Sequence, residues 1–277
     1  MNLGIMQGRL SKPVSSKIQE FPRFSWKEEF AIANKLQLSR IEWTIDFEST
    51  LQNPLLVEEE RSNILSIQSE FGVFVDSVTM DYFIEAPIHK CNEKTRKQSS
   101  WESLSRILHQ ISKAGIRVAV LPIVHESGVE DSRSLDSLRG ILGRLDNLAR
   151  KHELLVALEC EMSLEAIDYL ISPIKNTTNL GFNFDMGNSA AIGNDPIAEM
   201  SLYGCRLFNV HIKDRLPNDI TVPLGMGAVN FEKIFEYLDA NSYSRNIILQ
   251  CARGPSGFEF QQTSTYLTFL REKGWKF

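Results

Sequence analysis

Eight short apolar runs recur along the chain, and each is followed by a longer stretch whose apolar residues repeat with the spacing of a helix face. This alternation is typical of repeated strand–helix units, in which the helices return the chain so that the strands pair in parallel. It predicts an α/β protein with these eight strands: Leu3–Gln7, Arg40–Asp46, Val73–Met80, Arg117–Val124, Leu154–Glu161, Leu180–Asp185, Leu207–Lys213 and Asn246–Ala252.

The length of the chain agrees with eight such units. Its 277 residues are close to the roughly 250 residues typical of a (β/α)₈ barrel. Hydrophobic residues make up 43% and charged residues 23% of the chain, as in a soluble globular protein with a full core. Because no linker-like or low-complexity segment divides the sequence, we predict one (β/α)₈, or TIM, barrel domain over residues 1–277.

Helix boundaries are indicated by short polar signals. A capping-box sequence predicts a helix start, as does a capping side chain followed by proline, and glycine suits a helix end. The start signals are Ser25-Trp26-Lys27-Glu28, Asn53-Pro54 and Asp195-Pro196, and the end signals are Gly72 and Gly115.

A doubly wound open sheet would also alternate strands and helices, and the placement of polar residues distinguishes the two folds. In the sixth predicted strand, Phe182 and Phe184 share one side, whereas Asn183 and Asp185 share the other. In a barrel the apolar side packs against helices and the polar side points inward. The second and seventh strands alternate in the same way, which favours a closed barrel with a polar interior.

Three inward side chains with metal-ligating groups lie near the ends of successive strands. Glu159, Asp185 and His211 come from the fifth, sixth and seventh strands, at the rim where barrel enzymes hold their active sites. Buried charges need a partner. Gln250 on the eighth strand completes the quadrant, and oxygen and nitrogen ligands without sulfur favour a divalent ion such as Mn²⁺, Co²⁺, Mg²⁺ or Zn²⁺.

Each of these residues also has a structural alternative. Glu159 fits an ion pair with a lysine or arginine at a strand end, and His211 fits a core histidine bonded to a backbone carbonyl. Asp185 fits the N-cap of a following helical turn. Gln250 fits a residue that hydrogen-bonds beside the metal without touching it, because a neutral amide is a weaker ligand than a carboxylate.

Five segments extend the pattern beyond these side chains: LECE, NFDMGNS, NVHIKDR, PLGMGAVNF and ILQCARG. Their order and spacing resemble those of xylose isomerase-like barrels of the sugar-phosphate isomerase and epimerase family, over nearly the whole chain. The resemblance implies a metal bound at Glu159, Asp185, His211 and Gln250. It also implies a metal-dependent isomerase or epimerase that acts on a ketose or sugar phosphate through an enediolate, with Glu159 as the base and His211 in the catalytic centre.

The fourth metal position departs from the family, which usually has glutamate there. The amide of Gln250 offers an oxygen to a metal but takes up no proton near neutral pH. Ketose 3-epimerisation, as the family chemistry implies, needs a proton-transfer group on each face of the substrate, whereas aldose–ketose isomerisation can use one base. The departure favours isomerisation, and epimerisation would need a water or another inward group such as Glu161, His125 or Lys213.

Other functions stay open. A keto-sugar or inosose dehydratase or lyase would use the same enolising site, and a barrel with an altered fourth ligand could bind a sugar without catalysis. Metal-dependent phosphodiester cleavage is disfavoured because such sites hold several metals and His211 is the one histidine within a strong motif.

Basic side chains at the predicted rim favour a sugar or sugar phosphate as the bound partner. Arg9, Lys213, Arg215 and Arg253 follow the first, seventh and eighth strands and suit a phosphate or polyhydroxyl group. Glu42, inward on the second strand, joins this substrate-binding set, with a structural ion pair as its equal alternative.

Charge and hydropathy restrict the partners and the compartment. A net charge of −5 argues against nucleic acid as a partner, because gripping a phosphodiester backbone requires clustered Lys and Arg. No segment resembles a signal peptide or a membrane span, and the four scattered cysteines suggest neither disulfides nor a zinc ribbon. We expect a complete cytoplasmic protein without a membrane partner, and a homo-oligomer through exposed helices is an open expectation.

Overall fold

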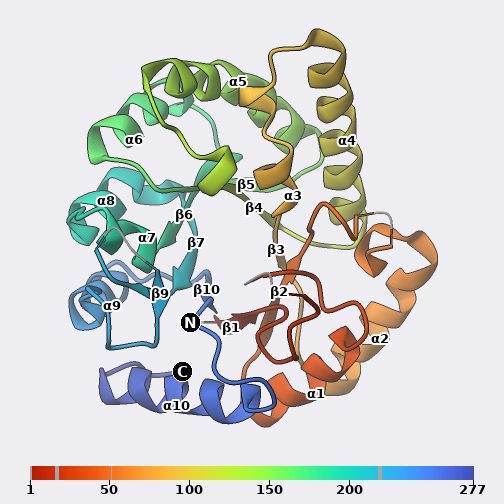
Figure 1. Cartoon of the computed structure of the whole chain (residues 1–277), viewed down its shortest axis with the longest axis vertical. Coiled ribbons are helices and arrows are strands. Elements are labelled where there is room, and N and C mark those ends of the chain that lie inside the picture. The colour runs from red at the N-terminus through yellow and green to blue at the C-terminus, as the bar shows by residue number, and fades with distance from the viewer. Residues whose placement is uncertain (1, 16–18, 51, 218–219) are drawn as a thin grey trace.

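The computed structural model describes residues 2–15, 19–50, 52–217 and 220–277. Eight parallel strands close into a barrel in the order β1-β10-β7-β6-β5-β4-β3-β2, which confirms the predicted fold (Figure 1). The barrel strands are β1 (Asn2–Met6), β2 (Arg40–Thr44), β3 (Ser77–Thr79), β4 (Val118–Ile123), β5 (Leu155–Cys160), β6 (Leu180–Asp185), β7 (Leu207–Ile212) and β10 (Asn246–Leu249).

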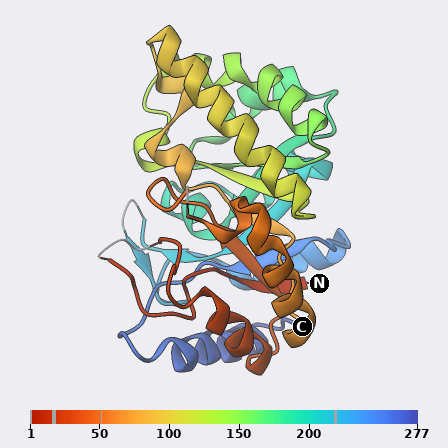
Figure 2. The same ribbon diagram turned by 90° about the vertical axis from the view of Figure 1, so that its right-hand side faces the viewer.

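Helices cover the outside of the barrel, as expected when each strand feeds a returning helix. Both views place the last helix, in blue, beside the first, in red, at the seam where β1 pairs with β10 (Figure 2). The helices are α1 (Trp26–Lys35), α2 (Arg61–Phe71), α3 (Tyr82–Glu85), α4 (Lys94–Lys113), α5 (Ser132–Lys151), α6 (Leu164–Ile171), α7 (Met186–Ala191), α8 (Pro196–Tyr203), α9 (Phe231–Ala240) and α10 (Glu259–Glu272).

Most of the helix boundary signals act as predicted. Asp195 caps α8 through hydrogen bonds from two backbone N–H groups, and Asn53 caps a short 3₁₀ turn (Pro54–Leu56). Gly72 ends α2 in the left-handed conformation, with φ of 65°. The capping box at Ser25 is wrong, because Ser25 precedes α1 but its side chain makes no capping hydrogen bond.

Several predicted strands are longer than the observed ones. The third was expected over Val73–Met80, but β3 spans only Ser77–Thr79, because Phe74 forms an isolated bridge with Arg40 instead of joining a continuous ladder. The eighth ends at Leu249. After β7 the chain also forms a small antiparallel hairpin that was not predicted, β8 (Asp214–Arg215) with β9 (Thr221–Val222).

The side chains inside the barrel are apolar near the amino ends of the strands and polar near their carboxyl ends. Near the amino ends of the strands, Val118, Val120, Ala157 and Phe208 form a separate apolar cluster. Further along β5, β6 and β7 the inward side chains are polar and buried: Glu159, Asn183, Asp185, Asn209 and His211. The apolar cluster closes one end and leaves the polar side chains at the carboxyl ends, where the candidate site lies.

None of the helices in the described part of the chain combines the length and apolarity of a membrane span.

Candidate metal centre

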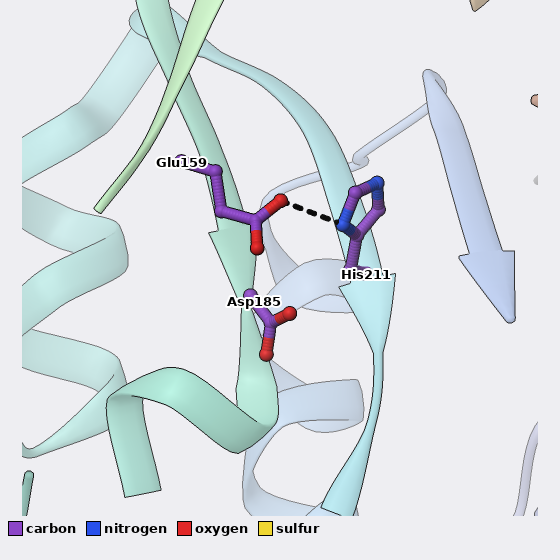
Figure 3. A group of neighbouring side chains, drawn as sticks. All are labelled: Glu159, Asp185 and His211. Carbon is purple, nitrogen blue, oxygen red and sulfur yellow. Dashed lines mark ion pairs between the residues drawn. The ribbon is translucent and has the colours of Figure 1, made fainter. Parts of the chain in front are cut away.

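Glu159, Asp185 and His211 converge at the carboxyl ends of β5, β6 and β7 (Figure 3). Each offers one ligand atom, and these atoms all lie within 4.8 Å of one another. All three side chains are buried. The alternation of the strands turns each of them inward, and the ladder pairs Asp185 directly with His211.

His211 is held between two carboxylates. Its Nε2 lies 2.7 Å from Oε1 of Glu42, and its Nδ1 lies 3.0 Å from Oε2 of Glu159. The second oxygen of Glu42 accepts hydrogen bonds from Ser77 Oγ and Asn209 Nδ2. A carboxylate behind a metal-ligating histidine fixes the ring and increases its basicity, so Glu42 lies where it would support His211 from behind.

Two asparagine amides orient the carboxylate of Glu159. Asn183 donates through Nδ2 to one oxygen and Asn188 donates through Nδ2 to the other, both at 3.0 Å. Asn209 in turn donates to Oδ1 of Asn183, which fixes that amide. The carboxylate therefore keeps one orientation without losing its ability to accept a proton.

Electrostatics favour an ion pair in the metal-free site. Burial lowers the pKa of His211, but the charges of Glu42 and Glu159 outweigh burial and raise this pKa to about 10. Burial also raises the pKa of Glu159, yet the His211 and Lys213 charges reverse this and hold it at about 2. A divalent cation would take the place of the imidazolium proton between these side chains.

Asp185 caps a helix, the structural alternative predicted for it, and also belongs to the candidate metal cluster. Its Oδ1 accepts the backbone N–H of Asn188 and so caps α7, while Oδ2 lies 2.8 Å from Nζ of Lys213. Burial raises the pKa of Asp185. Lys213 thus neutralises Asp185 in the metal-free arrangement.

The donor set fits a divalent ion. Two carboxylates and one imidazole supply oxygen and nitrogen at the spacing of a single coordination sphere, with no sulfur. Gln250 follows β10 and donates through Nε2 to Oε1 of Gln19. Its own Oε1 is buried and accepts no hydrogen bond within the described residues, so an oxygen lone pair is left for a ligand.

The predicted substrate-binding cations fall into two groups. Arg9 and Arg253 line one pocket between β1, β10 and α10. Arg215 instead donates to Glu161 and to Oδ1 of Asn188, on the side of Glu159. Lys213 pairs with Asp185, as described above. Glu42, the fifth predicted substrate residue, lies fully buried behind His211.

The loop that carries Arg9 is fixed by Glu29 of α1. Glu29 accepts the backbone N–H groups of Gly8 and Leu10 and the hydroxyl of Ser11. Gly8 has a φ of 87°, which only glycine adopts readily. Burial lowers the pKa of Arg9 to about 10, helped by the nearby charge of Arg253, so the pocket brings two like charges together.

The candidates for a second acid or base are spread around the mouth. Glu161 is ion-paired with Arg215, and Lys213 with Asp185. His125 is exposed, in a 3₁₀ turn with φ of 52°. None of the three forms a hydrogen bond or an ion pair with Glu159 among the described residues.

The sequence placed Asn183 on the inward side of its strand but did not give it a role beside Glu159. It missed Asn188, which lies one turn after Asp185 within the NFDMGNS segment. It also missed Asp81, which directly follows the third predicted strand, and Gln19, which lies in a loop where strand alternation gives no signal.

Comparisons with known proteins agree with this architecture. The model of the xylose isomerase-like TIM barrel family matches residues 33–272. The chain belongs to this family. Among curated relatives, the L-ribulose-5-phosphate 3-epimerase UlaE of Salmonella paratyphi A is 24% identical over 235 residues, which covers 79% of each chain.

Solved structures of this family share the fold. The xylose isomerase domain protein from Planctomyces limnophilus superposes with a TM-score of 0.75 at 18% identity, covering 98% of this chain and 96% of that one. The IOLI protein with a bound zinc atom gives a TM-score of 0.75 at 15% identity over 100% of both chains. At these identities the similarity establishes the fold and no more.

Proposed function

We propose that this protein is a metal-dependent isomerase or epimerase that enolises a ketose or ketose phosphate, with Glu159 as the base. The observation that carries the proposal is the convergence of Glu159, Asp185 and His211 within 4.8 Å at the barrel mouth. The similarity to L-ribulose-5-phosphate 3-epimerase supports a phosphorylated ketose as substrate.

Glu159, Asp185 and His211 would hold the divalent ion, with the free Oε1 of Gln250 as a fourth ligand. The zinc in the IOLI protein supports a metal in this fold. When bound, the ion would act as a Lewis acid that polarises the substrate carbonyl and stabilises the enediolate. Glu42 holds the imidazole of His211 through Nε2, which would leave Nδ1 to ligate the ion.

Glu159 would move the proton. Its carboxylate removes the hydrogen on the carbon next to the carbonyl and later returns a proton to the enediolate. Asn183 and Asn188 keep its two oxygens in place through the transfer. Burial excludes water from the carboxylate, which favours return of the proton to the substrate.

Arg9 and Arg253 would bind the phosphate end of the substrate. They line the same pocket beside the loop after β10, and in many barrels the loops after the last strands bind phosphate. Glu29 fixes the Arg9 loop, so this cation is held in place before the substrate arrives.

Proton exchange in D₂O, followed by NMR, tests the proposed function. The wild-type protein loaded with Mn²⁺ or Zn²⁺ should introduce deuterium at C1 or C3 of L-ribulose 5-phosphate or a related ketose. Deuterium at C1 identifies isomerisation, deuterium at C3 identifies epimerisation, and loss of water identifies a dehydratase. Glu159→Gln should reduce exchange by at least about 100-fold.

The matched control is Glu161→Gln, which changes a neighbouring carboxylate that pairs with Arg215. It should keep exchange within a few-fold of the wild type. Metal content should be about one ion per chain and should be lost in His211→Ala. A metal content that neither Glu159→Ala nor His211→Ala reduces would overturn the proposed site.

A further inference from the structure

Asp81 is a half-buried carboxylate on the side of the barrel mouth opposite the candidate metal ligands of β6 and β7. It follows β3 by two residues and shares the parity of Ser77 and Thr79. Ser77 points inward, because its hydroxyl donates to Glu42 inside the barrel. Asp81 therefore lies at the rim, two residues beyond the last residue of this inward face.

The strand register relates the position of Asp81 to that of Glu159. Thr79 pairs with Val120 on β4, and Val120 pairs with Ala157 on β5. Asp81 lies two residues beyond Thr79, past the end of β3, and Glu159 lies two residues beyond Ala157, where it pairs with Pro122 of β4. The two carboxylates thus both lie at the mouth, on sides of the barrel two strands apart.

The side chain of Asp81 does not serve the helix that follows it. Asp81 is the N-cap of α3, but its carboxylate makes no capping hydrogen bond. It accepts instead from Gln19 Nε2 at 2.9 Å and from Thr79 Oγ1 at 3.3 Å. The structural reason for an aspartate at a helix start is therefore absent here, and the side chain instead faces Gln19.

Gln19 joins Asp81 to the position where the family usually has glutamate. Its Nε2 donates to Asp81, while its Oε1 accepts from Gln250 Nε2 and from Arg9 Nη2, both at 3.2 Å. One glutamine therefore connects the carboxylate at β3 with the neutral amide at β10. Gln250 stands where the family usually has a carboxylate, and the carboxylate of Asp81 lies on the other side of Gln19 from it.

The charge environment supports a proton-transfer role. Burial and the charge of Glu159 raise the pKa of Asp81 to about 7, against the hydrogen bonds from Gln19 and Thr79. Near neutral pH this carboxyl group populates both its protonated and its ionised form.

We propose that Asp81 is the second proton-transfer group of the site and that, together with Glu159, it makes the enzyme a ketose 3-epimerase. This inference rests on the proposed function. Glu159 takes the C3 proton, and the C–H bonding electrons form the enediolate. Protonated Asp81 then gives its proton to C3 from the opposite face while the carbonyl reforms. Solvent returns both carboxyl groups to their starting states, and the reverse reaction exchanges their roles.

Deuterium washout separates the two carboxylates. The substrates are L-ribulose 5-phosphate and its C3 epimer, both 2-keto-pentose 5-phosphates. Each is deuterated at C3 and incubated with the Mn²⁺-loaded enzyme in H₂O. In Asp81→Asn the conversion of one epimer into the other should fall by at least about 100-fold. The epimer whose proton Glu159 removes should still lose its deuterium. Glu159→Gln should show the converse pattern.

Several results would overturn the assignment. One is conversion by Asp81→Asn within about threefold of the wild type, and another is equal loss of washout from both epimers. Wild-type protein that washes out no C3 deuterium but exchanges at C1 would leave the proposed isomerase function intact and overturn the Asp81 assignment alone. Wild-type protein that exchanges no proton of either epimer would overturn the proposed function itself.

Two measurements show whether Asp81→Asn retains a normal site. Its Mn²⁺ dissociation constant by calorimetry and its thermal midpoint should stay close to the wild-type values, and a defect in either would point to a structural role. Asp81→Glu should recover part of the conversion. The control Asp76→Asn changes a carboxylate at the opposite end of β3, which pairs with Arg40, and should leave conversion unchanged.

Discussion

The Nε2 atom of His211 lies 2.7 Å from Oε1 of Glu42, although 169 residues separate the two in the sequence. Both side chains are fully buried, and β2 and β7 carry them into the barrel from different sides. Glu42 has no other cation beside it among the ion pairs of the described residues. Its charge therefore acts on the imidazole, and through it on any metal bound at Nδ1.

Glu42→Gln should weaken metal binding without removing a ligand. The amide can still accept from His211, but it lacks the charge that increases the basicity of the ring, and loss of such a partner typically costs about 10–100-fold in metal affinity. Calorimetric titration with Mn²⁺ measures this. Glu48→Gln, an exposed change beyond the same strand, is the control. Equal affinities in wild type and Glu42→Gln would contradict this role.

Metal binding should release about one proton between pH 7 and 9. The pKa of His211 is raised to about 10, so the imidazole is protonated throughout this window in the metal-free protein and must lose that proton to bind a metal. Affinity should therefore rise about tenfold per pH unit. Titration in buffers of different ionisation enthalpy counts the proton, and His125→Ala should not alter it. A pH-independent affinity would rule out the raised pKa.

The pH dependence of the free energy of unfolding of the metal-free protein should reflect the titration of His211 and Glu159. The pKa of His211 is raised in the folded protein, so its protonated form stabilises the fold. This stabilisation is complete below pH 6.5, the ordinary pKa of histidine, and is lost as the pH rises through about 10. The pKa of Glu159 is lowered, so its ionised form stabilises the fold above pH 4.5, the ordinary pKa of glutamate. This stabilisation is lost as the pH falls through about 2. Urea unfolding should show the greatest contribution of this pair between pH 5 and 6.5, and His211→Ala should flatten the profile.

The barrel and its triad could be predicted because both depend on local patterns. Alternation within one strand is enough to place Asp185 inward. The partner of Glu42 could not be predicted, because its contact with His211 exists only once the barrel closes and both side chains meet in its interior. The charge at Glu42 was visible in the sequence, but a substrate role and a structural ion pair explained it equally.

Loop residues account for most of what was missed. Asp81 stands just before a short helix, where aspartate is common for capping, and only the folded structure shows that it makes no capping bond. Gln19 lies in the segment between β1 and α1, where no periodicity indicates direction. The capping box predicted at Ser25 does not form, because a short polar signal indicates only a tendency and the surrounding packing determines which hydrogen bonds form.

Gly181 provides a test of how closely β6 and β7 pack. A Cβ added there would come within 2.6 Å of the Phe208 ring and would also strike the Arg206 carbonyl. Gly181→Ala should lower the free energy of unfolding by about 1–3 kcal/mol. Gly143→Ala on exposed α5, where nothing lies within 4 Å, should instead raise it by about 0.5–1 kcal/mol. Urea denaturation compares them, and equal shifts would contradict the close approach.

Arg253→Ala should discriminate between phosphorylated and free sugars. Arg253 and Arg9 line one pocket, and their like charges lie close enough that Arg253 lowers the pKa of Arg9. An anion bound there would relieve this repulsion, and a hydrogen bond to a charged group contributes about 1.5–3 kcal/mol. The KM for a ketose 5-phosphate should therefore rise by about 10–100-fold, while the KM for the free ketose changes little.

The control for this variant is Arg271→Ala on the outer surface of α10, where the guanidinium packs over Phe277. It removes the same charge at the far end of α10 without touching the pocket, so both KM values should stay near those of the wild type. Equal increases for the two substrates in Arg253→Ala would show that this arginine supports the loop, through its bond to the Ser11 carbonyl, and does not bind phosphate. Such a result would move the phosphate to the other cationic side of the mouth, where Lys213 and Arg215 lie.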